Sequence, residues 1–126
     1  MKGGGKMKLF DSELKVMEIL WENGDCPAGM IATTLLQQVG WNRNTTYTVI
    51  KKLIKKGAIQ RTEPSFMCTP LITRQQVQQD EAEEFLDKFF GGSPEAFLST
   101  FVSGKRISQD EIAHLKQLIK RLEEGD

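Results

Sequence analysis

Three short amphipathic segments, each followed by a glycine, constrain the fold of this chain more than any other feature. Residues 11–23, 27–39 and 42–56 place apolar side chains at helical spacing on one face, and Gly24, Gly40 and Gly57 follow them. Glycine accepts the left-handed conformation that ends many helices, and Asn42 is a good N-cap for the third segment. Pro27 is expected in the first turn of the second. Because the connections are brief, the pattern predicts a helix-turn-helix core.

The apolar period changes after Gly57. Residues 58–62 and 66–69 are typical of short extended segments, and Glu63, Pro64 and Ser65 between them are turn-forming residues. A two-stranded ribbon behind a third helix predicts a winged-helix DNA-binding domain over residues 9–72. The Gly- and Lys-rich residues 1–8 that precede it are predicted to be disordered.

Residues 73–126 are predicted to form three further helices. Gly91 and Gly92 end the first, Ser93 and Pro94 begin the second, and Ser108 with Glu111 fits the capping box that begins the third. So small a helical array leaves apolar surface exposed unless a symmetric partner covers it. We therefore expect a mostly α chain, with the winged helix followed by a small three-helix dimerisation region. The predicted dimerisation residues are Phe85, Phe89, Phe97, Phe101, Ile112, Leu115, Ile119 and Leu122.

The net charge of zero conceals two unlike halves. The chain has 17 Lys and Arg and 17 Asp and Glu. Up to Glu63 there are 10 basic and 6 acidic residues, a net charge of +4, whereas the remainder has 7 basic and 11 acidic residues, a net charge of −4. This asymmetry predicts a first half that binds a polyanion and an acidic second half.

The third helix carries the residues best suited to double-stranded DNA. In a major groove, Arg43 can pair with a guanine edge, Asn44 with adenine, and the threonine methyl groups can touch thymine. Lysines further along the helix suit phosphates, which position a protein without reading sequence. The predicted DNA-binding residues are Arg43, Asn44, Thr45, Thr46, Tyr47, Thr48, Lys51, Lys52, Lys55 and Arg61.

The composition argues against several other classes of protein. His114 is the only histidine, and no set of acid, base and nucleophile indicates an enzyme. Cys26 and Cys68 lack C-x-x-C spacing, so they are interpreted as reduced packing residues, with no metal or cofactor site. No apolar run approaches the ~20 residues that span a membrane, and the N-terminus lacks the apolar core of a signal peptide. A cytoplasmic protein is expected.

The stretch Trp41–Gly57 resembles the recognition-helix signature of the penicillinase and methicillin-resistance repressors, a family that also holds copper-responsive repressors. The resemblance implies a winged helix that binds an inverted-repeat operator and a C-terminal region that forms a homodimer. It implies that Arg43, Asn44, Thr45, Tyr47, Thr48 and Lys52 face the DNA. The likeness continues at Glu13, Val16-Met17, Trp21, Thr69-Pro70-Leu71, Glu81-Ala82, Phe85-Leu86, Gly91-Gly92-Ser93, Phe101 and residues 107–112.

Three departures from the family pattern bear on function. The family commonly has Ser-Pro-Lys where this chain has Asn42, Arg43 and Asn44, so a different operator sequence is expected. Its wing is usually longer and more polar than residues 63–65. The family's antibiotic-responsive members are released by a membrane sensor protease that cuts between Asn and Phe, and the matching bond here is Thr100-Phe101.

The signal that releases the repressor is not identified by the sequence, and cleavage near Thr100-Phe101 is one candidate. Two alternatives to this repressor stay open at this point. The first is a winged-helix module that binds protein through its aromatic C-terminal helices. The second is a ligand- or metal-responsive DNA-binding regulator, although the C-x-C pairs of the copper-responsive members are missing from this chain.

Overall fold

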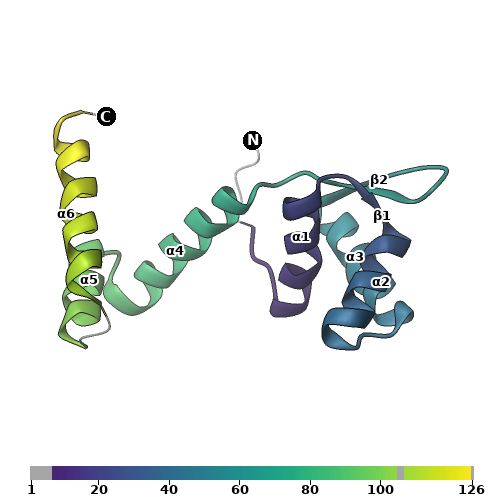
Figure 1. Ribbon diagram of the computed structural model, residues 1–126, viewed down its shortest axis with the longest axis horizontal. Helices are drawn as coiled ribbons and strands as arrows, with labels where there is room; N and C mark the ends of the chain where they lie inside the picture. The colour runs from purple at the N-terminus through teal and green to yellow at the C-terminus, as the bar shows by residue number, and fades with distance from the viewer. Residues whose placement is uncertain (1–6, 105–106, 126) are drawn as a thin grey trace. The chain divides into compact units, whose positions relative to one another are not determined.

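A computed structural model describes residues 7–104 and 107–125 (Figure 1). The described residues up to Ala82 form one compact unit, and those from Glu83 onward form a second. In chain order the elements are α1 (Asp11–Asn23), β1 (Cys26–Pro27), α2 (Ala28–Val39), α3 (Arg43–Lys56), β2 (Ile59–Thr62), β3 (Met67–Pro70), α4 (Arg74–Phe90), α5 (Pro94–Ser103) and α6 (Gln109–Glu123). The predicted mostly helical fold with an N-terminal winged helix is confirmed.

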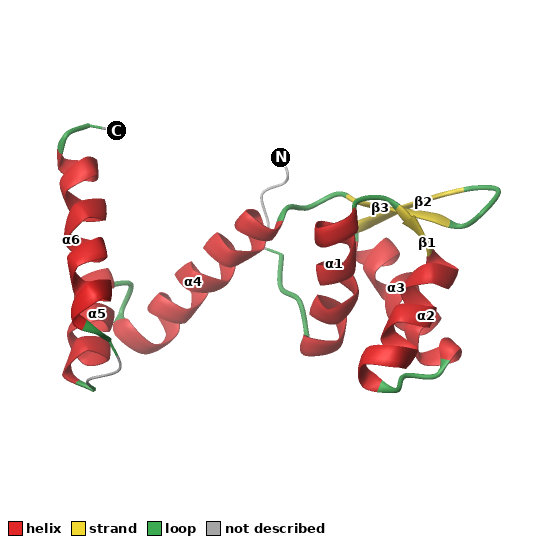
Figure 2. Cartoon of the chain, viewed as in Figure 1, coloured by secondary structure: helices red, strands yellow, loops and turns green. Residues whose placement is uncertain are grey.

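The first unit has a continuous apolar core beneath its helices. The inward faces of α1, α2 and α3 meet there and pack against β2 and β3 (Figure 2). The largest of its fully buried apolar side chains are Met17, Leu20, Ile31, Leu35, Ile50, Leu53 and Ile59. Three apolar stripes that cannot be buried singly therefore stabilise one another.

The predicted helix ends are largely confirmed. Gly40 and Gly57 follow α2 and α3 in the left-handed conformation, at φ 76° and 88°. The side chain of Asn42 accepts a hydrogen bond of 2.8 Å from the backbone N–H of Thr45, as an N-cap does. The placement of Pro27 was wrong, because this residue is the N-cap of α2 and belongs to β1.

The sheet has three strands rather than the two expected. Its order is β1-β3-β2, with both pairs antiparallel, and Cys26 lies opposite Cys68. A strand of two residues has no alternation to recognise, so the sequence did not predict β1. Both cysteines are buried free thiols. Burial, with a smaller contribution from Cys26, raises the pKa of the Cys68 thiol to about 11, which favours the inert protonated form.

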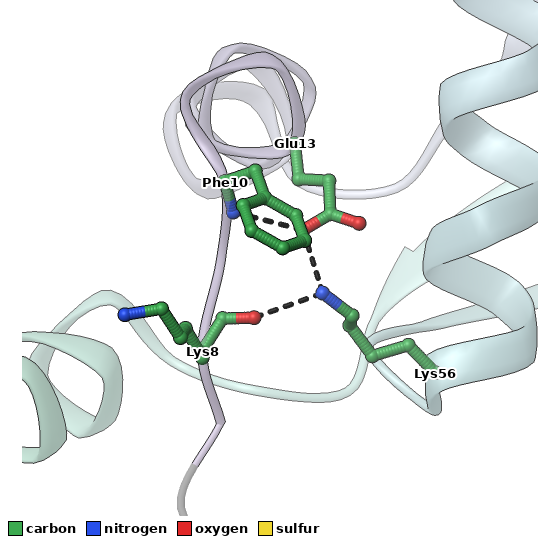
Figure 3. Close-up of polar contacts among 4 residues, drawn as sticks. All are labelled: Lys8, Phe10, Glu13 and Lys56. Atoms are coloured by element: carbon green, nitrogen blue, oxygen red, sulfur yellow. Dashed lines mark hydrogen bonds and ion pairs between the residues drawn. The ribbon is translucent and has the colours of Figure 1, made fainter.

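A polar network attaches the segment before α1 to the ends of α1 and α3 (Figure 3). Lys56 Nζ lies 2.6 Å from Glu13 Oε1 and donates to the carbonyl oxygen of Lys8 at 2.8 Å. The same carboxylate oxygen of Glu13, a residue only 3% exposed, accepts a 2.9 Å bond from the N–H of Phe10. Met7 and Lys8 are thus part of the packed unit, and the prediction of disorder does not hold for them. Residues 1–6 lie outside the described residues.

The first part of α4 packs on the winged helix. Val77 is buried, Arg74 forms an ion pair with Glu18, and the N–H of Met7 donates to Asp80 at 3.2 Å. Trp21 Nε1 donates to the carbonyl oxygen of Ile72 at 2.9 Å. The division between the units therefore falls inside α4, ten residues beyond residue 72, the predicted end of the winged-helix domain.

The second unit comprises the end of α4 together with α5 and α6. Its phenylalanines contact one another, with ring centroids 5.2 to 5.9 Å apart. Ser108 and Glu111 form the predicted capping box, with bonds of 2.9 and 3.1 Å. Nevertheless, none of the described residues from Glu83 onward is buried. In the part of the chain that the structure covers, no helix combines the length and apolar character needed to cross a membrane.

Candidate nucleic-acid interface

Helix α3 has one buried face and one exposed, basic face. Val49, Ile50 and Leu53 are buried in the core of the first unit. The helix contains five basic residues and no acidic one. The exposed side chains on its other face are Arg43, Asn44, Thr45, Thr48, Lys51, Lys52 and Lys55. This surface, which we call the α3 polar face, carries most of the residues predicted to bind DNA.

Thr46 is a correction to the predicted set. Its side chain is fully buried, and its hydroxyl oxygen has no hydrogen-bond partner among the described residues. It precedes Val49, Ile50 and Leu53 by three, four and seven positions, which is the spacing of one helix face. The sequence therefore contained the signal that Thr46 belongs to the core. It cannot reach a base edge while the domain stays folded.

The first turn of α3 favours a negatively charged ligand. The turn has no acidic residue, and its exposed side chains include Arg43 and Asn44. The aligned peptide dipoles of a helix place partial positive charge at this end. With a basic side chain added, the surface is electrostatically suited to approach a phosphate backbone.

Arg43 is held against Tyr47 one turn further along the helix. Arg43 Nη2 donates to the Tyr47 hydroxyl at 3.4 Å, and the guanidinium carbon lies 5.7 Å from the ring centroid. Gly29 on α2 lies beside them, since a Cβ built at this glycine would be 3.4 Å from Arg43 Nη2. The guanidinium group is thus bounded by two helices.

Phe66, in the turn just before β3, contacts Tyr47 of this pair. Its ring centroid is 5.7 Å from that of Tyr47, and the Arg61 guanidinium carbon lies 3.6 Å from the Phe66 ring centroid. Reasoning from the sequence missed Phe66 as a residue of the site. A phenylalanine in a short extended segment carries no signal that distinguishes a ring packed on a recognition helix from one packed in a core.

The lysines of α3 have two different roles. Lys51, Lys52 and Lys55 are exposed, as the predicted phosphate contacts require. Lys56 is instead held by Glu13 and the Lys8 carbonyl oxygen. Arg61 on β2 is exposed, and it forms an ion pair with Glu63, which is also exposed. Surface ion pairs of this kind contribute little and weaken with salt, so Arg61 can exchange Glu63 for another anion.

The residues predicted for dimerisation are partly exposed in the second unit. Phe97, Ile112 and Leu115 are half-buried. Phe101 and Leu115 also line a hollow of about 450 Å³ beside α6. Thr100 and Phe101, the predicted cleavage position, are exposed residues of α5. The remaining predicted residues are exposed: Phe85, Phe89, Phe101, Ile119 and Leu122.

Among the described residues, no three His, Cys, Asp or Glu side chains are grouped in a way that suits a metal ion. Cys26 and Cys68 face each other without a third ligand. Exposed basic side chains instead gather on α3, which contains no acidic residue. Fold and site together define the class of winged-helix transcription regulators.

The comparison with protein families identifies the particular group. The profile of the penicillinase repressor family matches residues 9–121. The chain therefore belongs to the penicillinase repressor family, which comprises transcriptional repressors and not enzymes. This confirms the resemblance seen in residues 41–57.

Two curated relatives and two solved structures are similar to the chain. The penicillinase repressor of Bacillus licheniformis is 26% identical over 115 residues, 90% of each chain. The methicillin resistance regulatory protein MecI of Staphylococcus aureus (strain N315) is 27% identical over 116 residues, 90% of this chain and 94% of the relative. The solution structure of the DNA binding domain of the repressor BlaI has a TM-score of 0.53 at 27% identity, covering 57% of this chain and 90% of that one. The B. licheniformis BlaI monomeric form in complex with the blaP half-operator has a TM-score of 0.50, with the same identity and coverage.

Proposed function

We propose that this protein is a dimeric transcriptional repressor that binds an inverted-repeat operator through α3. The observation that carries the proposal is the α3 polar face, a basic and exposed helix surface on a winged helix. Support comes from the BlaI structure, which is a complex with a half-operator. A half-operator is what one protomer of a two-fold symmetric repressor binds.

Base recognition is assigned to the first turns of α3. Arg43 and Asn44 are exposed there and have the donors and acceptors that suit guanine and adenine in the major groove. The methyl groups of Thr45 and Thr48 are available to thymine, whereas buried Thr46 is excluded from the proposal. Tyr47 is half-buried against Phe66 and contributes to base recognition mainly through its hydroxyl group.

Phosphate contacts are assigned to Lys51, Lys52, Lys55 and Arg61. All four are exposed. Each phosphate neutralised releases condensed counterions, so binding must weaken steeply as salt rises. These residues set affinity and register, and the first turns of α3 set sequence preference.

A second copy of the chain is assigned to the apolar surface of the second unit. Phe89 and Leu122 are 61% and 65% exposed, and the α5 and α6 helices bury no residue of their own. Removing such apolar surface from water would stabilise the dimer by about 25 cal/mol per Å². A symmetric dimer provides that burial and also supplies the second α3 for the second half-site.

Release from the operator is assigned to cleavage at Thr100-Phe101 by a membrane sensor protease. The bond lies in a regular helix, α5, among exposed residues. Cutting there severs the covalent link to α6, and five of the eight residues proposed for dimerisation lie beyond the cut. The wild-type chain incubated with membranes that contain the sensor should give a fragment starting at Phe101, detectable by mass spectrometry.

The DNA-binding proposal is tested by a salt series on matched variants. The operator is first located by footprinting upstream of the chain's own gene. We expect Lys51→Ala/Lys52→Ala to weaken binding and to reduce the slope of log K against log salt by about two, because each phosphate contact contributes about 0.9. Lys116→Ala/Lys120→Ala removes the same charge from exposed positions of α6 and should leave the slope unchanged. Equal slopes in all three proteins would refute the assignment.

A further inference from the structure

A continuous chain of ring and guanidinium contacts connects the wing to the first turn of α3. Arg61 lies over one ring, that of Phe66, with its guanidinium carbon 3.6 Å from the centroid. The Phe66 ring packs on Tyr47 at 5.7 Å with an interplanar angle of 58°. Tyr47 in turn accepts the 3.4 Å hydrogen bond from Arg43. Cation–π and tilted aromatic contacts are favourable, so each side chain in this series restricts the conformations of the next.

The backbone at Phe66 is held in a conformation that such a residue rarely adopts. Its φ is 50°, in the left-handed region that favours glycine. A strained conformation persists only where surrounding contacts determine it. The Phe66 carbonyl oxygen accepts a 2.9 Å bond from the N–H of Ala28, the first residue of α2. The ring and the carbonyl group of Phe66 therefore tie the wing to both helices of the helix-turn-helix.

We propose that Phe66 is a positioning residue for DNA recognition, which holds Arg43 in its reading geometry through Tyr47. This inference rests on the proposed operator binding. A flexible arginine loses side-chain entropy when it pairs with a base, and prior restraint reduces that loss. Gly29 of α2 lies beside the guanidinium group, since a Cβ built there would be in ordinary van der Waals contact with Arg43 Nη2. The short wing thus affects base selectivity without its tip needing to reach the DNA.

The test compares selectivity, not affinity alone. The preferred site is selected from randomised duplex DNA with the wild-type full-length protein. The base read by Arg43 is then the position at which Arg43→Ala loses discrimination. We expect Phe66→Leu to lower the affinity ratio between the preferred site and the site changed at that base by about tenfold, with the other positions unaffected. Phe66→Tyr, which keeps the ring, should have an affinity ratio within about twofold of the wild-type ratio.

A double-mutant cycle separates positioning from a general loss of structure. In the Arg43→Ala background, Phe66→Leu should cause no further loss at that base, since the side chain it positions is gone. Tyr47→Phe keeps the ring on Phe66 but removes the hydroxyl acceptor. It should lower the affinity ratio about threefold at the same base only. Ser65→Ala, an exposed neighbour in the wing, is the matched control and should match wild type.

Three results would overturn the inference. The first is a Phe66→Leu variant with the same selectivity as wild type. The second is a loss of selectivity from Phe66→Leu that is equally large with and without the Arg43 side chain. If Phe66→Leu proves unfolded by circular dichroism, Tyr47→Phe decides, and unchanged discrimination there overturns the inference. A wild-type protein that shows no preference between selected and scrambled DNA would instead refute the proposed function, and this inference would fall with it.

Discussion

The two compact units bury their apolar residues to very different degrees. Met17, Ile31, Ile50 and Leu53 in the first unit are fully buried, or nearly so. In the second unit the phenylalanines touch one another, yet none of its described residues is buried. The first unit therefore stabilises itself, whereas the second leaves apolar surface that only another surface can cover. On the proposed dimer, the first unit folds through its own core and the second unit provides the surface for association.

The largest effect is expected from a cavity in the first unit. Leu53 is fully buried where α3 meets the core, so Leu53→Ala should lower the free energy of unfolding by about 3 kcal/mol. Leu118→Ala removes the same atoms from a position that is 46% exposed in the second unit. Urea denaturation at low protein concentration should show a loss several times smaller for Leu118→Ala. Equal losses would remove the distinction between the units.

The next effect concerns association of the second unit. Ile119→Asp places a charge among the exposed apolar residues of α6, and should raise the dimer dissociation constant at least about a hundredfold, since an unpaired buried charge is costly. Sedimentation should then show monomers. Gln117→Asp introduces the same charge at an exposed polar position and should still dimerise. Dimers of both variants would place the interface elsewhere.

The smallest effect is a pH dependence that belongs to the first unit. Burial raises the pKa of the Cys68 thiol from 9.0 to about 11, so the folded state holds this proton more tightly than the unfolded state. The stabilisation is complete below pH 9 and is lost as pH rises towards 11. Unfolding free energies measured across this range should fall less steeply for Cys68→Ala than for wild type. Parallel slopes would contradict a buried, protonated thiol.

The parts of this fold that local chemistry determines were predictable. The Asn42 cap, the glycines after α2 and α3, and the Ser108 capping box depend on residues within one turn of each other. The strand β1 was missed because two residues become a strand only through pairing with β3, which is forty residues away. Helix bounds were thus readable from spacing, and sheet pairing was not.

The candidate site divides in the same way. The exposed basic residues of α3 follow from helical periodicity. The burial of Thr46 follows from it too, because Thr46 precedes Val49 by three positions and Leu53 by seven. The contact of Phe66 with Tyr47 depends on how the wing folds back, which no local pattern specifies. The residues proposed to read DNA are thus evident from the sequence, whereas the support proposed for Phe66 is evident only from the structure.

The most direct test of the account is a titration of the full-length protein against three duplexes of equal length. One carries the complete inverted repeat, one carries a single half-site, and one is scrambled. We expect two chains to bind the inverted repeat at least about a hundredfold more tightly than the half-site, and the half-site to bind more tightly than the scrambled duplex. Equal affinity for all three duplexes, or one chain on the inverted repeat, would contradict a dimer that reads DNA through two α3 helices.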